Sequence, residues 1–362
     1  MADSTPPQAQ SRGPPWARWL PPALIAILVI AGLTRVVYPV YRQRHLISVL
    51  EAKDFTVDTV SIFEEDWPIW FQNNLRGYVI KEVCICQIHP QCSDDDWGAI
   101  SELLSLTYGG FEYAGFNQLA IGKIPVSNRG LSHLKGVSQL DALTIASPNI
   151  TDESLKILNA IPNLRYLRLT SKHVTDSGLA ELKNLPILQA LDLENARITD
   201  SGLAVLSRFP ILTHVYLTNT QVTDSGLVLL GKIHRLQVLW LPNTRVTDRG
   251  LKHIAPLTNL SQLYLCGTQI TDQGLAHLSG MTSLEWLDLG STQVGDAGLP
   301  QIEKFVNLIS LRLDKTQVTD AGIPSLKRLT WLRMLNLKGT RISPAGIAEL
   351  KAALPKTDVT GP

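Results

Sequence analysis

Residues 236–259 read LQVLWLPNTRVTDRGLKHIAPLTN, and this stretch of 24 residues decides the fold. Its first part alternates apolar and other residues around Leu239 and Leu241, which is the period of a short strand. Its second part, residues 251–257, repeats an aliphatic residue at three-residue steps, which is typical of one face of a helix or a tight 3₁₀ segment. We therefore predict a strand followed by a short helix.

A Thr-Asp pair precedes the predicted helix and recurs along the chain. In residues 236–259 the pair is Thr247-Asp248, and its side-chain oxygens are expected to cap the first helical amides. A glycine follows two residues after the aspartate, and an aliphatic residue follows the glycine. This order returns at multiples of 24 residues without an insertion. The ten predicted units begin at Phe116, Leu140, Leu164, Leu188, Leu212, Leu236, Leu260, Leu284, Leu308 and Leu332.

One such unit is too small to form a core of its own. Ordering 24 residues costs about 36 kcal/mol, which its inward aliphatic side chains do not offset alone. Stacking the units buries both of their faces and completes a parallel strand ladder. The sequence therefore predicts a solenoid.

The order Leu-x-x-Leu-x-Leu followed by Thr-x-Val-Thr-Asp-x-Gly-Leu resembles a leucine-rich repeat, over about two-thirds of the chain. The variant is similar to repeats of a group of bacterial membrane-anchored proteins and to the cysteine-containing repeats of F-box adaptors. The resemblance implies an α/β leucine-rich repeat solenoid: a right-handed horseshoe with a concave parallel sheet and convex short helices.

Two places depart from the repeat pattern. Six later units carry threonine at the turn after the strand, but earlier units carry Ile124, Pro148, Lys172 and Ala196 there, so different loop hydrogen bonds are expected. The last unit has Ser343-Pro344 in place of Thr-Asp, which predicts a serine cap followed by a first-turn proline.

The composition excludes several classes of protein. The 362 residues include 33 Lys+Arg and 32 Asp+Glu, so no strongly basic domain indicates nucleic-acid binding. A basic excess lies in residues 1–53, which hold six basic and two acidic residues, and the remaining 27 basic and 30 acidic residues leave residues 54–362 mildly acidic as a whole. Four cysteines do not make a disulfide scaffold in a chain of this length.

Residues 19–41 are apolar enough to form a helix that spans the roughly 30 Å core of a bilayer. We expect a single-pass N-terminal anchor there; the alternatives are a cleaved signal peptide and a buried helix of a soluble domain. Arg35, Arg42 and Arg44 favour an uncleaved anchor, because basic residues flank its end. The count of basic residues leans toward a cytoplasmic repeat domain and leaves the side of the membrane open.

The segment before the repeats contains signals of a cap, which a solenoid needs over its open apolar end. A short helix is expected over 46–53, an aromatic-rich helix over 67–71, a strand over 83–86 and a helix over 97–106. The expected division of the chain is a disordered tail (1–18), a transmembrane anchor (19–41), an N-terminal cap with an irregular first unit (42–115), ten repeats (116–355) and a closing segment (356–362).

The repeat frame also predicts which side chains face the concave surface. The middle strand position of successive units places three aromatic rings at the centre, flanked on each side by an aspartate and then an arginine. The predicted partner-binding residues are Arg168, Asp192, Tyr216, Trp240, Tyr264, Asp288 and Arg312, with His214 and Trp286 in the neighbouring column. Exposed aromatic residues with a polar rim are typical of interface hot spots. The alternative is that the charges form cross-strand ion pairs and the rings only pack the ladder.

These residues predict a membrane-anchored scaffold that binds a protein partner through its concave face. Two alternatives are a regulator that inhibits an enzyme by occlusion and a surface that stacks glycans. No cofactor, metal site or catalytic motif is expected, and Asp192 and Asp288 lie too far apart to act as a catalytic pair. Cys92 could form a disulfide with Cys84 or Cys86 in an oxidising compartment, or all three could be free thiols.

Overall fold

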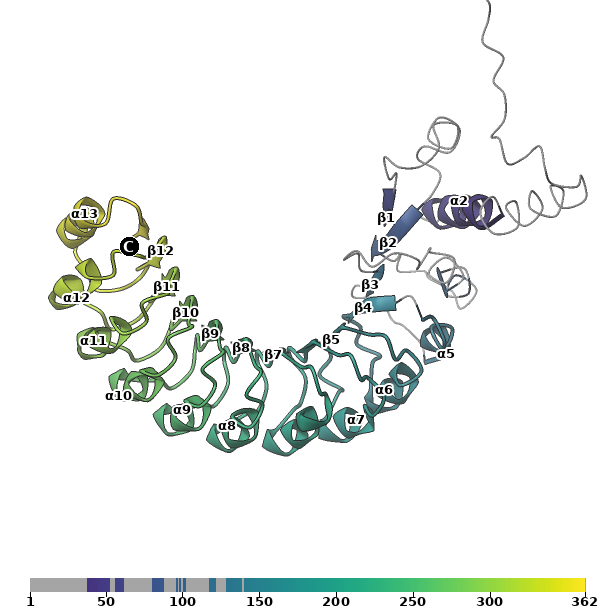
Figure 1. Cartoon of the computed structure of the whole chain (residues 1–362), viewed down its shortest axis with the longest axis horizontal. Coiled ribbons are helices and arrows are strands. Elements are labelled where there is room, and N and C mark those ends of the chain that lie inside the picture. Colours follow the sequence, from purple (N-terminus) through teal and green to yellow (C-terminus); the bar gives the residue numbers. More distant parts are fainter. Residues whose placement is uncertain are drawn as a thin grey trace, which may run out of the picture.

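The computed structural model describes residues 38–52, 56–61, 80–87, 96, 98, 100–101, 117–121, 128–138 and 140–361. Strands line the inner side of an arc and helices its outer side (Figure 1). The strands form one sheet in sequence order, with β1 antiparallel to β2 and the rest parallel. They are β1 (Thr56–Ser61), β2 (Ile80–Gln87), β3 (Asn117–Ile121), β4 (Leu140–Ile145), β5 (Tyr166–Leu169), β6 (Ala190–Asp192), β7 (His214–Tyr216), β8 (Val238–Trp240), β9 (Gln262–Tyr264), β10 (Trp286–Asp288), β11 (Ser310–Arg312), β12 (Met334–Asn336) and β13 (Asp358–Thr360).

The outer side of the arc carries short α-helices and 3₁₀ segments, as the three-residue spacing predicts. They are α5 (Asn128–Ser132), α6 (Asp152–Leu158), α7 (Asp176–Glu181), η3 (Asp200–Arg208), α8 (Asp224–Leu230), α9 (Asp248–Ile254), α10 (Asp272–Leu275), η4 (Ala276–Leu278), η5 (Asp296–Gly298), α11 (Leu299–Ile302), η6 (Asp320–Gly322), α12 (Ile323–Lys327) and α13 (Pro344–Ala353). The apolar core is continuous along the arc, since the aliphatic residues of neighbouring units touch. The predicted solenoid is confirmed.

Ahead of the repeats lies α2 (Tyr38–Glu51), which confirms a helix where one was predicted over 46–53, begins eight residues earlier and ends at Glu51. Leu46, Ile47 and Leu50 are buried and join the core of the repeats. The predicted strand over 83–86 is confirmed as part of β2.

Two of the other cap predictions fall wholly or partly outside the described residues. The helix predicted over 97–106 is confirmed at its described residues, 98 and 100–101. The helix predicted over 67–71 and the thiol of Cys92 lie outside the described part of the chain.

Within the described residues, no helix combines the length and apolar character that a membrane span requires. Most of the predicted anchor, residues 19–37, lies outside the described part. Its last four residues, 38–41, form the start of α2.

The Thr-Asp pair has two separate roles, which corrects the prediction that both residues cap their own helix. In five units the threonine hydroxyl accepts a hydrogen bond from the amide two residues later, as predicted. The aspartate instead reaches the next unit, where its carboxylate accepts from the backbone amide of the next threonine at 2.8–2.9 Å and from its hydroxyl at 2.5–2.7 Å. We call this series the threonine–aspartate ladder. It joins Asp152 to Thr175, Asp176 to Thr199, Asp200 to Thr223, Asp224 to Thr247, Asp248 to Thr271 and Asp296 to Thr319.

The glycine that follows each Thr-Asp pair except Thr151-Asp152, where Ser154 stands, leaves room for this ladder. A Cβ atom on Gly202 would lie 2.3 Å from Oδ1 of Asp176, and Gly250 would meet Asp224 at 2.4 Å. The Thr-Asp-x-Gly motif therefore links each repeat to the next by hydrogen bonds.

The turns after the strands also follow the repeat. From the fourth unit on, each turn has one residue with positive φ: Asn195, Asn219, Asn243, Gly267, Ser291, Lys315 and Gly339. The six later threonines, such as Thr244, are buried and donate to the carbonyl three residues earlier at 2.5–2.7 Å. In the earlier unit with Lys172, the buried hydroxyl of Ser171 donates to Ile150 O instead. The expected difference in loop bonding is confirmed.

The last unit ends the array as the sequence predicts. The Ser343 hydroxyl accepts from the Gly346 amide at the start of α13, and Pro344 occupies its first turn. Within the segment 356–362, β13 pairs with β12 and extends the sheet.

The threonine–aspartate ladder is incomplete at Gly295, where only the backbone amide reaches Asp272. Gly295 has an extended backbone (φ −127°), and a Cβ atom there would meet nothing closer than 3.5 Å. We predict that Gly295→Thr raises the free energy of unfolding by about 1–2 kcal/mol, because its hydroxyl would donate to Asp272 and the unfolded chain would lose freedom. Urea unfolding of the full chain measures this. Gly295→Val is the control, since it adds a branched side chain without a donor and should recover only the smaller, entropic part.

Candidate functional site

The three-residue strands fix which side chains face the concave surface. In β8 the central Leu239 is fully buried in the core, so Val238 and Trp240 project from the other face. The register places Trp240 beside Tyr216 on β7 and Tyr264 on β9. The aromatic row predicted from the sequence is therefore assembled.

The three rings touch one another. The ring centroids of Tyr216 and Trp240 are 5.3 Å apart at an interplanar angle of 66°, and those of Trp240 and Tyr264 are 4.1 Å apart at 40°. All three side chains are partly exposed. The Trp240 Nε1 atom is buried and has no hydrogen-bond partner in the described part of the chain.

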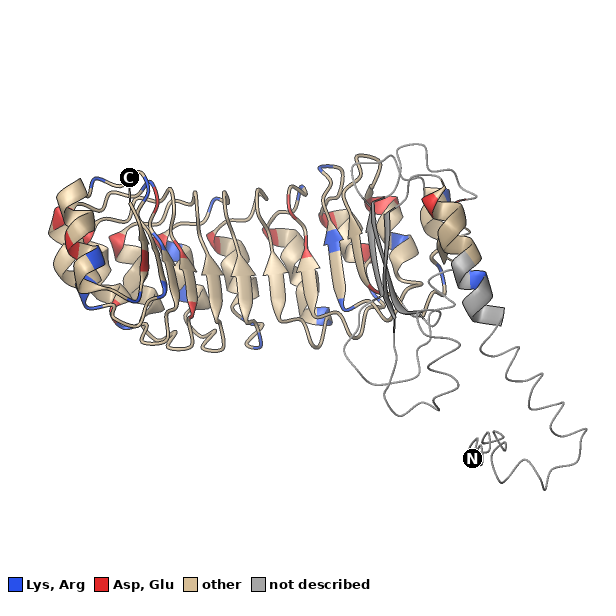
Figure 2. Cartoon of the chain, turned by 90° about the horizontal axis from the view of Figure 1, so that it is seen from above, with Lys and Arg blue, Asp and Glu red and all other residues tan. Residues whose placement is uncertain are grey.

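The concave positions of β7–β9 form a surface without formal charge, which we call the central patch. It consists of His214, Tyr216, Val238, Trp240, Gln262 and Tyr264. Burial lowers the pKa of His214 below its ordinary 6.5, so this imidazole is neutral at neutral pH. Seen from above, the middle strands lack the blue and red of charged residues that mark the strands on either side (Figure 2).

An arginine–carboxylate cluster borders the central patch on each side. Arg168 lies 3.2 Å from Asp192 and 2.5 Å from Glu194. The predicted cross-strand ion pair is therefore present, with a second carboxylate that the sequence-based prediction did not include.

The opposite border repeats this arrangement. Arg312 lies 3.2 Å from Asp288 and 3.2 Å from Asp314. Asp192 and Asp288 are about 19 Å apart by strand spacing, so the two clusters are separate. Each cluster holds one cation and two anions.

The two inner aspartates are deeply buried, with 5% of Asp192 and 4% of Asp288 exposed. Burial raises the pKa of both carboxyl groups above the ordinary 3.8. A backbone amide, from Glu194 to Asp192 and from Gly290 to Asp288, acts in the opposite direction, as does the arginine.

This burial predicts a pH dependence. A raised carboxyl pKa in the folded chain contributes stability below pH 3.8, and that stability is lost as the pH rises through the folded pKa. We expect the stability difference between the wild type and Asp288→Asn to shrink as the pH rises from 4 toward 7. Urea midpoints of both proteins across this range test the sign; a difference that stays constant or widens would contradict it.

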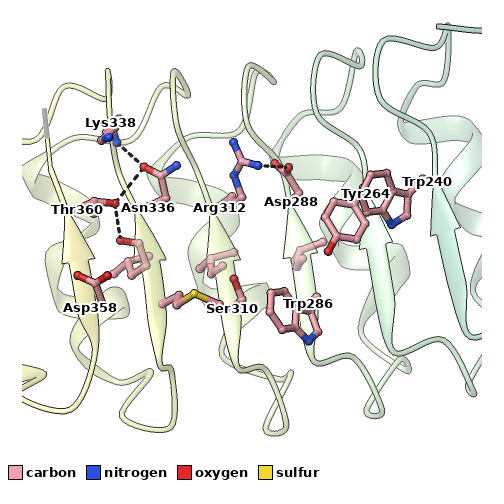
Figure 3. Close-up of a pocket in the computed structure, with 14 residues that line it drawn as sticks. Trp240, Tyr264, Trp286, Asp288, Ser310, Arg312, Asn336, Lys338, Asp358 and Thr360 are labelled. Atoms are coloured by element: carbon pink, nitrogen blue, oxygen red, sulfur yellow. Dashed lines mark hydrogen bonds and ion pairs between the residues drawn. The ribbon is translucent and has the colours of Figure 1, made fainter. Parts of the chain in front are cut away.

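Trp286 lies in the neighbouring column of concave positions and lines a groove over β10–β13, to which Trp240 and Tyr264 also contribute. It follows Gln262 in the register and is partly exposed. The groove has a volume of about 470 Å³, and Trp286, Arg312, Asn336 and Thr360 are among the residues that line it (Figure 3). The sequence-based prediction included Trp286 and Arg312 and missed the groove itself.

The other histidine, cysteine and acidic side chains of the described residues form no metal site. Within the described residues, no three histidine, cysteine or acidic side chains lie close enough to hold a metal ion. Cys266 is a partly buried free thiol, and burial raises its pKa. Cys84 and Cys86 lie on β2.

Comparison with known proteins adds the following. Residues 184–207 match a family model described as leucine-rich repeat. An internalin crystal structure from Listeria monocytogenes strain 4b F2365 superimposes with a TM-score of 0.55 and 23% sequence identity, covering 77% of this chain and 86% of that one. The repeats of this chain are leucine-rich repeats.

A second leucine-rich repeat structure also resembles this one. Internalin C2 of the same strain shares 24% identity over 66% of this chain and 84% of its own, with a TM-score of 0.43. No curated protein matches the chain in sequence. The likeness to the first internalin shows the leucine-rich repeat fold.

Proposed function

We propose that this protein is a membrane-anchored leucine-rich repeat scaffold that binds a protein partner through its concave face. The observation that carries the proposal is the central patch: an uncharged surface of three touching, partly exposed aromatic rings, bordered by two charged clusters. Buried aromatic anchors within a polar rim are where interface binding energy concentrates.

The exposure of the Trp240 ring supports binding as well as packing. Trp240 is the middle ring of the row and is only partly buried between Tyr216 and Tyr264, so part of its surface remains available to a partner.

The bordering arginines supply a polar rim. The side chains of Arg168 and Arg312 are 38% and 47% exposed, whereas their partners Asp192 and Asp288 are nearly covered. The guanidinium groups are held in place by two carboxylates each, so little side-chain freedom remains to be lost on binding. A partner with polar groups about 19 Å apart would reach both clusters.

The proposed anchor is the apolar segment 19–41, which contacts the lipid bilayer and places the protein in a membrane as a single-pass protein. The support is its length, its lack of charge before Arg35 and the basic residues that follow. Because α2 begins at Tyr38 and packs on the repeats through Leu46 and Leu50, the solenoid would stand directly at the membrane surface.

Photocrosslinking in native membranes tests the partner face. A photoreactive residue replaces Gln262, on the concave strand β9, or Gln273, on the convex helix α10 of the same repeat. We expect a discrete protein adduct from position 262 and none from position 273. Adducts from 273 alone, or equal adducts from both positions, would refute a concave binding face.

The anchor has its own test. The full chain should stay in the membrane pellet after alkaline extraction, and a chain beginning at residue 42 should be released. Release of the full chain would contradict the anchor without bearing on the binding face.

A further inference from the structure

The groove over β10–β13 has a small polar residue at its floor; Ala190 lies likewise between Tyr166 and His214, but it carries no polar group. The first residues of β10, β11 and β12, which we call the lower row, are Trp286, Ser310 and Met334. They are neighbours in register, so a small residue lies between two large ones. The two large residues are about 10 Å apart by strand spacing. The result is a notch whose walls are an indole and a thioether (Figure 3).

The floor of the notch holds an unpartnered polar group. Ser310 is 6% exposed, and its hydroxyl makes no hydrogen bond to any residue that the structure describes. Its oxygen is not one of the fully buried unpartnered atoms of the described residues, so it stays accessible from the groove. Ser310 therefore offers both a donor and an acceptor to a ligand in the notch.

The last residues of β10–β13 form the upper row of the groove. Their side chains are polar and already bonded to one another or to neighbouring residues. Arg312 is held by Asp288 and Asp314, and the Asn336 amide donates to Asp314 at 3.1 Å. The Asn336 carbonyl oxygen accepts from the Thr360 hydroxyl at 3.2 Å. These planar groups are fixed before any ligand arrives, so binding would cost them little entropy.

The charge of the lining restricts the ligand. Among the charged side chains that line the groove, Asp288 and Asp358 balance Arg312 and Lys338. Neither an anion nor a cation is favoured. An aliphatic peptide side chain would fit between the two walls but would leave the Ser310 hydroxyl unmet and strip water from Arg312 and Asn336.

We infer that this groove is a binding site for a neutral saccharide. The apolar face of a sugar ring would stack on Trp286, its hydroxyls would bond to Ser310, and its edge would face Arg312 and Asn336. The volume of about 470 Å³ is that of a small-molecule site and admits more than one ring. The groove adjoins the central patch, since Trp240 and Tyr264 also line it, but the inference does not depend on the proposed protein partner.

The test titrates neutral disaccharides against the full chain in nanodiscs free of glycolipid and sugar-based detergent. The probes are cellobiose, maltose, lactose and chitobiose, and the readout is saturation-transfer NMR of the sugar protons. We expect at least one probe to bind in the millimolar range. Trp286→Ala should weaken that binding by about tenfold or more, since it removes the stacking surface.

A second variant separates loss of the site from loss of the fold. Ser310→Gln fills the notch with a residue that the fold accepts at the same register in β9, where Gln262 stands. It should abolish sugar binding and leave the melting temperature unchanged. Tyr216→Ala is the matched control, because it removes an aromatic ring from the central patch at a residue that does not line the groove, and it should leave sugar binding intact.

Three results would overturn the inference. The first is that no probe binds. The second is that sugar binding persists in the Trp286→Ala variant and in the Ser310→Gln variant, and the third is that binding is lost in Tyr216→Ala alone. If a protein adduct from Gln262 depended on Ser310 while no sugar bound, the groove would be a peptide site instead.

Discussion

Alanine at Gly202 is expected to lower the free energy of unfolding by about 3 kcal/mol, far more than a glycine-to-alanine change in a helix usually does. The added Cβ atom would lie 2.3 Å from Oδ1 of Asp176, so the carboxylate must turn away. Asp176 would then lose the hydrogen bonds from the Thr199 amide (2.9 Å), the Thr199 hydroxyl (2.5 Å) and the Ser201 hydroxyl (2.7 Å). Hydrogen bonds to charged groups contribute about 1.5–3 kcal/mol each in favourable cases.

A double-mutant cycle isolates this cause. Asp176→Ala alone should cost about as much as Gly202→Ala, and the double variant should cost little more than either, because both remove the same bonds. Gly280→Ala is the control, since a Cβ atom there meets nothing within 4 Å. Additive losses in the double variant would show that the glycine has another role.

Replacement of Trp240 by alanine is expected to weaken partner binding by about 100-fold, equivalent to roughly 3 kcal/mol. Trp240 is the middle ring of three and contacts both Tyr216 and Tyr264, so its removal opens the centre of the proposed interface. The measurement compares the affinities of the wild type and the variant for the partner protein that photocrosslinking at position 262 identifies. Val228→Ala, at an exposed apolar residue of α8, is the control and should bind normally.

A conservative variant distinguishes contact from packing. Trp240→Phe keeps a ring between the tyrosines but removes the buried, unpartnered N–H. It should retain most of the affinity and gain about 1 kcal/mol of stability. If Trp240→Ala leaves both the affinity and the melting temperature unchanged, the aromatic centre is not a hot spot.

The amino-acid sequence is sufficient to predict the repeating part of the molecule, and the reason is its period. Strand alternation around Leu239 and Leu241 places each concave residue, and an uninterrupted 24-residue step keeps the register. The same period predicts the row from Arg168 to Arg312 on the concave face, together with its two ion pairs.

The contacts that the sequence does not predict depend on the direction of side chains between neighbouring units. Periodicity does not show that Asp176 bonds to the following repeat, or that Glu194 and Asp314 join the arginine clusters. The repeat frame does contain a signal for Glu194 and Asp314, because the two residues occupy the same position in repeats that lie five units apart. The antiparallel pairing of β1 and β2 lies outside the repeat frame, so no period predicts it.

The gap in the threonine–aspartate ladder at Gly295 lies between the repeat that carries Tyr264 and the repeat that carries Trp286. Its consequence is mechanical. We expect the joint that lacks one inter-repeat bond to bend more easily than its neighbours, and it lies between the repeat of Tyr264 in the central patch and the repeat of Trp286 in the groove. Bending there would change the angle between the central patch and Trp286, so the affinity of a ligand that touches both would depend on residue 295.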